Sequence, residues 1–238
     1  ARVRRQEIGQ KRGMGGPGLF TQFSISDPTV VASIPQRQLA NGLVDAFTHV
    51  MEQYMTYPTS ATLQDRISEG ILSTLIEIAP KLMDNPSDYG TAANFMWSCN
   101  MALNGLIQKG VPTDWSIHAI GHEITAAYNV DHARTLAIVL PSLYRFKFEQ
   151  KQAKLAQYGR RVLSLEGTDF DVAHQAIDHT EAFFHSLGIE TKLSAYTPDA
   201  TSFPERAAAQ LESYGATRLG EHKDITPKEV VTILNATL

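Results

Sequence analysis

The sequence is poor in cysteine, in net positive charge and in long apolar runs. Cys99 is its one cysteine in 238 residues, which excludes a disulfide framework within the chain and fits a reducing compartment such as the cytoplasm. Its 21 lysines and arginines are outnumbered by 25 aspartates and glutamates, so no overall positive field favours nucleic acid as a partner. No run of about 18 apolar residues occurs, so we expect no membrane span.

The sequence also lacks two features that would mark the start of a protein or a nucleotide site. It begins at Ala1 rather than at a methionine and carries no signal-peptide pattern. We therefore expect that the front of a longer protein precedes this chain. Glycines cluster between Gly13 and Gly18, but no helical pattern follows them directly. They do not form the glycine-rich phosphate-binding turn that joins a strand to a helix.

Beyond Pro35, apolar residues recur at the three- and four-residue steps of amphipathic helices. Asp114 is the expected N-cap of a central helix, and prolines and glycines separate the helical segments. The most regular stripe comprises Leu63, Ile67, Ile71, Leu75, Ile78 and Leu82. We expect about nine helices, over residues 36–55, 60–83, 88–109, 114–128, 132 to beyond 141, 150–165, 169–187, 204–214 and 226–235.

The first 34 residues have a different character. Glycines and Pro17 exclude a helix over residues 13–18. The alternation in residues 20–26 predicts one short strand, closed by Asp27 and Pro28. The sequence therefore predicts an all-α multi-helix bundle over residues 35–238, preceded by a short extended segment over residues 1–34.

Histidines and one carboxylate occur at helical spacing in apolar segments. Asp45 and His49 are four residues apart, as are His118 and His122, so each pair shares one helix face. An unpaired carboxylate among the apolar neighbours of Asp45 would cost several kcal/mol, which a bound cation offsets. Zn²⁺ and Fe²⁺ both accept carboxylate and imidazole ligands. The spacing therefore predicts a divalent metal site, without deciding which of His118, His122 and His132 bind.

Two familiar metal motifs are excluded. A zinc-protease helix needs a second histidine three residues after the glutamate of His122-Glu123, and residue 126 is alanine. A di-iron bundle needs paired Glu-x-x-His motifs, and the sequence has none. Two other classes of protein stay open at this point. One is a metal-dependent hydrolase that uses metal-activated water, and the other is a non-catalytic helical interaction module whose histidines are core residues.

The order of these residues and the amino-acid sequence around them resemble those of a known family. The segments concerned are FSISDPT, QLANGLVDAFTHVMEQY, LQDRISEGIL, ALNGLIQKGVPTDWSIHAIGHEITAAYNVDHARTLAIVLP and LGEHKDIT, which together extend over most of the chain. They are similar to the iron-containing (group III) alcohol dehydrogenases. Within that family they most resemble the bacterial branch of NADPH-dependent aldehyde reductases and butanol dehydrogenases.

The resemblance implies roles for particular residues. It implies one divalent metal, Fe²⁺ or Zn²⁺, held by Asp45, His49, His118 and His132. It places His122 beside the nicotinamide and the substrate without binding the metal. His122 could pass a proton to the substrate oxygen, since the unperturbed pKa of histidine lies near working pH. Lys11 corresponds to a lysine that contacts the cofactor at the domain boundary, although it could also be an exposed loop residue.

The resemblance also implies a missing partner. Family members have an N-terminal α/β domain that binds NADP(H) or NAD(H) and a C-terminal all-α domain that holds the metal. By this comparison residues 35–238 are the metal-binding domain, of the dehydroquinate synthase-like type, and residues 1–34 are a tail of the cofactor-binding domain. We expect the full-length enzyme to interconvert small aldehydes and alcohols. The chain alone should have little activity and should form homo-oligomers.

Overall fold

Helices make up most of the part of the chain that a computed structural model describes, namely residues 2–5, 10–13, 16–19 and 21–238. The all-α prediction is confirmed, and each predicted helix has an observed counterpart within this part. The α-helices are α1 (Gln36–Tyr54), α2 (Thr62–Asp84), α3 (Tyr89–Leu103), α4 (Ser116–Tyr128), α5 (His132–Phe146), α6 (Phe148–Arg161), α7 (Asp169–Ser186), α8 (Phe203–Ser213) and α9 (Pro227–Asn235). Short 3-10 turns are η2 (Pro17–Leu19), η3 (Pro28–Ser33) and η4 (Leu193–Ala195).

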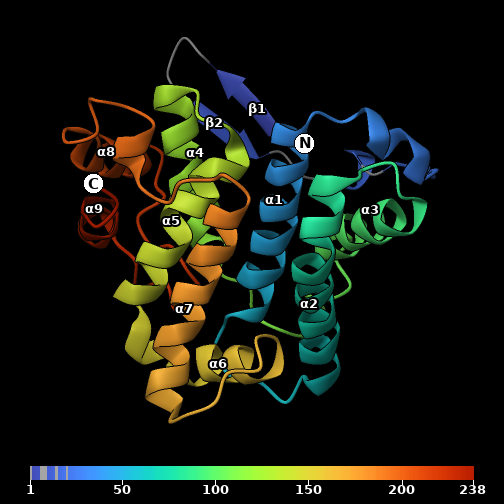
Figure 1. Cartoon of the computed structure of the whole chain (residues 1–238). Coiled ribbons are helices and arrows are strands. Elements are labelled where there is room, and N and C mark those ends of the chain that lie inside the picture. The colour runs from blue at the N-terminus through green and yellow to red at the C-terminus, as the bar shows by residue number, and fades with distance from the viewer. Residues whose placement is uncertain (1, 6–9, 14–15, 20) are drawn as a thin grey trace.

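Helix α1 runs through the middle of the bundle (Figure 1). It packs against α2 and α3 on one side and against α5 on the other, while α4 packs against α5 and α6 packs against α7. Its side chains are buried on nearly every face, from Leu39 to Tyr54. A helix enclosed in this way presents most of its polar side chains to its neighbours, and His49 is buried among them whereas Asp45 is half-buried.

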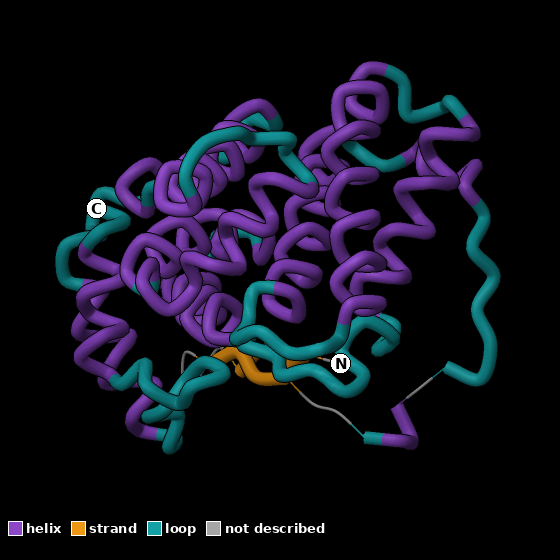
Figure 2. The backbone as a smooth tube through the Cα atoms, turned by 90° about the horizontal axis from the view of Figure 1, so that it is seen from below, coloured by secondary structure: helices purple, strands orange, loops and turns teal. Residues whose placement is uncertain are grey.

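The N-terminal segment differs from its prediction. Strands β1 (Arg2–Arg5) and β2 (Gln10–Gly13) pair antiparallel, with Arg2 opposite Gly13. The strand predicted over residues 20–26 is wrong for the described residues 21–26, which form neither helix nor strand and lie exposed along the outside of the bundle (Figure 2). A strand is stabilised by a ladder of hydrogen bonds to a neighbour, and no described strand lies alongside this segment. Residue 20 lies outside the described residues.

Two helix boundaries also differ, for local reasons. Helix α3 ends at Leu103 rather than near residue 109, because Gly105 adopts a φ of 91°, a left-handed conformation that stops a helix. Helix α4 begins at Ser116 and has Trp115 as its N-cap residue. Asp114, the predicted N-cap, still accepts a hydrogen bond from the Ser116 amide at 2.9 Å. The Asp114 side chain therefore still caps α4, although it lies one residue before the N-cap position.

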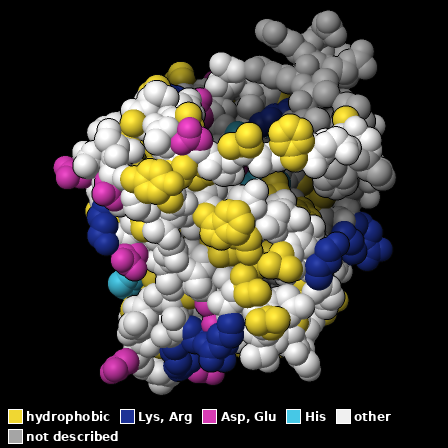
Figure 3. Space-filling model, turned by 90° about the vertical axis from the view of Figure 1, so that its right-hand side faces the viewer, with side chains coloured by type: hydrophobic (Ala, Val, Ile, Leu, Met, Phe, Trp, Pro, Cys, Tyr) yellow, Lys and Arg dark blue, Asp and Glu magenta, His cyan; other side chains and the backbone are white. Residues whose placement is uncertain are grey.

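Apolar side chains gather on the side of the molecule where α2 and α3 lie (Figure 3). The large apolar residues exposed on α3 and just after it are Tyr89, Trp97, Leu103 and Leu106. We refer to these four residues as the α3 face. None of the described helices is both long and apolar enough to cross a membrane.

Close packing of α6 on α7 generates the first testable prediction. A Cβ atom on Gly159 would lie 2.6 Å from Val172 Cγ1 and 3.2 Å from the Val172 carbonyl oxygen, whereas a Cβ on Gly70 would meet nothing within 4 Å. We expect Gly159→Ala to lower the free energy of unfolding by about 1–3 kcal/mol through overpacking. Gly70→Ala should raise it by about 0.5–1 kcal/mol, because alanine favours helix. Urea unfolding measures the free energy of unfolding of both variants. Equal changes in the two variants would contradict the close packing of Gly159 against Val172.

Candidate metal centre

Three helices meet at the candidate site. Helix α1 carries Asp45 and His49, α4 carries His118 and His122, and α5 begins with His132. Asn129 adopts a left-handed φ of 56° at the end of α4 and makes the short turn that lets α5 return beside it. This turn brings His132 beside His118 and His122. Because α1 packs against α5, Asp45 and His49 lie near the same place.

The ligand atoms lie close together. One ligand atom from each of Asp45, His118 and His132 lies within 4.8 Å of the other two. Asp45 Oδ1 is 3.7 Å from His132 Nε2 and 3.5 Å from His49 Nε2. The ring centroids of His49 and His118 are 4.3 Å apart. The ligand atoms of Asp45, His118 and His132 therefore converge between the helices, and His49 lies beside them, close to both Asp45 and His118.

This arrangement fits a divalent ion. Two ligand atoms at about 2.1 Å from one tetrahedral ion lie about 3.4 Å apart, close to the two distances from Asp45 Oδ1. One carboxylate and three imidazoles form an oxygen and nitrogen ligand set that suits Zn²⁺ and Fe²⁺. Asp45 is half-buried, whereas His49 and His118 are buried. One side of the centre is consequently more accessible than the other.

Glu52 is a site residue that the sequence analysis missed. Its carboxylate is buried, with Oε2 against His118 Nδ1 and with Oε1 accepting a hydrogen bond from the Ile117 amide at 2.7 Å. An acceptor on Nδ1 fixes the ring orientation and leaves Nε2 to face the centre, as outer carboxylates do for metal-bound histidines. Glu52 follows Asp45 by seven residues, two helical turns, and that spacing could have revealed it.

Burial shifts the pKa of Glu52. Burial, with the nearby charge of Asp114, raises the pKa of the Glu52 carboxyl well above its usual value, and hydrogen bonds from the Ile117 and His118 amides act the other way. A cation on the far side of the His118 ring would favour the ionised carboxylate. The charge state of Glu52 is therefore coupled to what the histidines bind.

Trp115 closes one side of the cluster. Its ring contacts His49 and His118 edge-on, with centroid distances of 5.7 and 5.4 Å. Its backbone has a φ of 62°, which is uncommon for a bulky residue. The indole lies against two predicted ligands and limits how far their rings can turn.

The other predicted residues lie next to the cluster. The His122 ring is 5.2 Å from that of His132 and 6.1 Å from that of His118. Neither His122 nor His49 belongs to the group of three whose ligand atoms converge, and His49 Nε2 approaches Asp45 Oδ1 at 3.5 Å. Lys11 is half-buried on β2, a strand that packs against α4. The structure thus places Lys11 on an element that touches the helix of His118 and His122.

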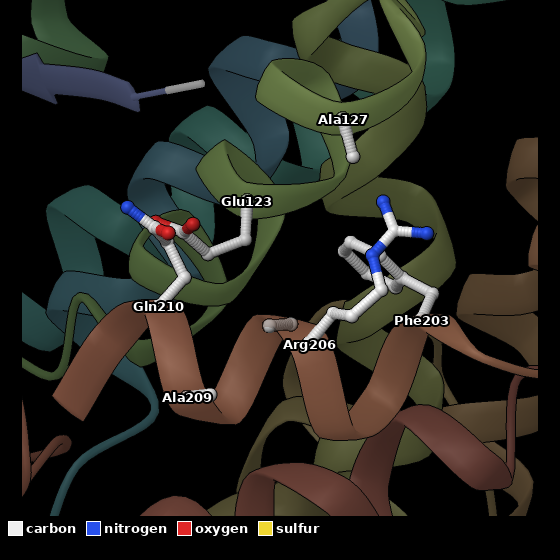
Figure 4. A pocket seen from close by; sticks show the side chains of 7 residues that line it. Glu123, Ala127, Phe203, Arg206, Ala209 and Gln210 are labelled. Atoms are coloured by element: carbon white, nitrogen blue, oxygen red, sulfur yellow. The ribbon is translucent and has the colours of Figure 1, made fainter. Parts of the chain in front are cut away.

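Two depressions lie near these helices. One has a volume of about 300 Å³ and is lined by Asp45 and His132 together with Gln38, Asn41, Gly42, Asp131 and Ala133. The larger, of about 380 Å³, lies between α4 and α8 (Figure 4) and is lined by Glu123, Ala127, Phe203 and Arg206, among others. The larger one contains none of the predicted ligands. Because Asp45 and His132 line the smaller depression, we expect a small molecule to reach the centre through it.

Comparisons with known proteins show the family of the chain. Residues 39–238 match the C-terminal model of the Fe-containing alcohol dehydrogenase family. The chain is 47% identical over 225 residues to the NADPH-dependent aldehyde reductase YqhD of Escherichia coli, covering 94% of this chain and 58% of that protein. It is 33% identical to a probable NADH-dependent butanol dehydrogenase of Bacillus subtilis, covering 98% of this chain and 60% of that protein.

Solved structures show the same fold. A substrate- and cofactor-free form of the E. coli aldehyde reductase YqhD matches with a TM-score of 0.94 and 45% identity, covering all of this chain and 63% of that one. The NADH-dependent butanol dehydrogenase A of Thermotoga maritima matches with a TM-score of 0.92 and 25% identity, covering all of this chain and 61% of that one. The chain therefore spans roughly 60% of the length of these relatives.

The position of Glu52 generates a prediction about metal binding. Glu52→Gln should weaken Zn²⁺ binding about 10- to 100-fold, the usual loss when an outer carboxylate of a metal-bound histidine is removed. Glu69→Gln is the matched control, because Glu69 is also buried but pairs with Arg66 and Arg161. Competition with a chromogenic chelator measures both affinities. The same loss in the two variants would show that Glu52 acts only on general stability.

Proposed function

The chain belongs to the Fe-containing alcohol dehydrogenase family, and on that basis we propose that it forms the metal-binding half of an alcohol dehydrogenase or aldehyde reductase. The observation that carries the proposal is the convergence of Asp45, His118 and His132 from three helices, with His49 Nε2 beside them at 3.5 Å from Asp45 Oδ1. The family resemblance implies the same four residues as ligands. In this proposal they hold one divalent ion, either Fe²⁺ or Zn²⁺.

The chemistry is a hydride transfer between a nicotinamide and a carbonyl carbon. When bound, the metal polarises the substrate oxygen as a Lewis acid, and NADP(H) or NAD(H) accepts or donates the hydride. Asp45 lowers the net charge of the centre, and the imidazoles of His49, His118 and His132 bind without adding charge. A small aldehyde or alcohol would approach through the depression lined by Asp45 and His132.

Two further side chains support this chemistry in the proposal. Glu52 holds the His118 ring so that its Nε2 points at the centre. His122, one turn beyond His118, gives a proton to the substrate oxygen from its ring nitrogen in the reductive direction and takes it back in reverse. Its ring lies 5.2 Å from that of His132, beside the proposed ligands.

The cofactor would bind mainly to a part of the enzyme that this chain does not supply. We propose that residues 1–34 are a tail of that cofactor-binding domain and that Lys11, on a strand beside α4, contacts the cofactor. Reductase activity then requires both domains. The printed names of the relatives include NADPH- and NADH-dependent enzymes, so the proposal covers both nucleotides. A cytoplasmic location, without nucleic acid as a partner, suits the single cysteine and the net charge of −4.

Metal content tests the proposed function. The purified chain, incubated with Zn²⁺ or Fe²⁺, should bind about one equivalent by elemental analysis, because all four ligands lie within it. His132→Ala removes one ligand and should abolish or sharply weaken that binding. His174→Ala is the control, since His174 stacks on Phe148 at 3.9 Å on other helices. A parent chain without metal, or equal loss in both variants, would contradict the proposal.

We also propose that the protein is a homo-oligomer. The α3 face exposes Trp97 with 63% and Leu103 with 51% of their surface accessible, and exposed apolar clusters often mark interfaces. Light scattering of the chain should give a mass above 26.2 kDa. Trp97→Lys should shift the mass toward the monomer, whereas Leu63→Lys on α2 should leave it unchanged. A parent that scatters only as a monomer would rule out this part of the proposal.

A further inference from the structure

A buried lysine connects helix α6 to the start of α4. Lys151 Nζ lies 3.0 Å from Asp114 Oδ2, 2.9 Å from Glu221 Oε1 and 2.7 Å from the carbonyl oxygen of Met55. All three charged side chains are nearly inaccessible, with 3–4% of each exposed. Three acceptors satisfy the three protons of the ammonium group. The lysine thus joins the end of α1, the segment before α4 and the loop that contains Glu221.

Asp114 transmits this connection toward the histidines. Its amide donates to the Glu52 carbonyl oxygen at 2.9 Å, and its Oδ1 accepts from the Ser116 amide at 2.9 Å. The next amide, that of Ile117, donates to Glu52 Oε1, and the Glu52 carboxylate contacts His118. One continuous series of hydrogen bonds therefore runs from Lys151 to a predicted metal ligand.

The same contacts hold an unusual backbone conformation. Trp115 has a φ of 62° between Asp114 and Ser116, and a non-glycine residue keeps such a conformation only where its surroundings impose it. The indole ring lies against His49 and His118. Release of Asp114 would therefore allow Trp115 to relax and would free the rings of both histidines to turn.

Charge explains why a lysine is needed there. Two buried carboxylates, Asp114 and Glu221, flank the same ammonium group. Burial alone would raise the pKa of Asp114, but the ammonium of Lys151 and several hydrogen bonds hold that pKa well below its usual value. Burial and the nearby Asp114 raise the pKa of Glu221 to about 7, so this carboxyl can take up a proton. Without the lysine, the Asp114 carboxylate would lose its counter-charge and a hydrogen-bond donor while it stays buried, a loss that favours local rearrangement. The rearrangement would fall at the first turn of α4.

We propose that Lys151 is a positioning residue of the metal centre, which acts through Asp114 and Glu52 on His118 and through Trp115 on His49. The inference rests on the proposed function, since it assumes that these histidines bind a divalent ion. Lys151 itself does not touch the metal or the substrate. Its role is to fix the start of α4 so that the ligand atoms stay converged.

The test compares two lysines of one helix. Lys151→Met should weaken Zn²⁺ binding about 10-fold or more, as loss of outer hydrogen bonds does at other metal sites. Lys154→Met is the matched control: Lys154 is also buried on α6, but its Nζ pairs with Asp65 at 2.5 Å and lies over Tyr54. Its Zn²⁺ affinity should stay within about 2-fold of the parent. Chelator competition gives the affinities, and circular dichroism confirms folding.

A second readout separates geometry from stability. In the Co²⁺-loaded protein, Lys151→Met should change the visible absorption bands, which report ligand geometry, while Lys154→Met should leave them as in the parent. Lys151→Arg keeps the charge and should restore both affinity and spectrum. An equal change in Lys151→Met and Lys154→Met, or no change in either, would overturn the role of Lys151 while leaving the metal site intact.

Lys151→Gln replaces Lys151→Met in these experiments if Lys151→Met does not fold. It also removes the charge, but it changes the polarity of the side chain less. Failure of both to fold, with Lys154→Met folded, would assign Lys151 to general stability and overturn the proposal. A parent chain that binds neither Zn²⁺ nor Co²⁺ would overturn the proposed function together with this inference.

Discussion

The contact between the Glu52 carboxylate and His118 is the constraint on which the site depends. Glu52 lies in the most enclosed helix of the bundle and reaches the first turn of α4, where it meets both the His118 ring and the Ile117 amide. A buried carboxylate without such partners would be costly. The same side chain therefore contacts both the start of α4 and the His118 ring, and links the packing of α4 on α1 to the position of that histidine.

Buried charges are concentrated at helix junctions around this centre. Lys151, Asp114 and Glu221 join α6 to the start of α4, while Lys154 and Asp65 join α6 to α2. Buried ion pairs give little net stability compared with apolar packing, but they are strongly destabilising when one partner is lost. Their arrangement favours one alignment of the helices over similar alternatives. For a site built from three helices, that precision matters more than added stability.

The relatives are longer than this chain. Their structures share this fold, yet the chain spans only about 60% of their length. The proposed ligands all lie within the chain, whereas the proposed nicotinamide contacts lie mostly beyond it. The proposed metal site can therefore be tested on this chain alone, whereas the proposed hydride transfer would also involve contacts that the chain does not supply. The division is physical, since a metal is held by a few atoms, whereas a dinucleotide needs an extended surface.

The sequence by itself determined the helices and the presence of a candidate metal site, because both depend on local spacing, while the choice among the histidines came from the family resemblance. Periodic apolar residues define helices such as α2, and a spacing of four places Asp45 and His49 on one face whatever surrounds them. Only the tertiary structure decided that His118 and His132 meet Asp45 while His122 lies beside them, that Glu52 orients His118, and that residues 21–26 form no strand. These features depend on contacts between residues up to 87 positions apart, as for Asp45 and His132, and no local pattern encodes which distant side chains will meet.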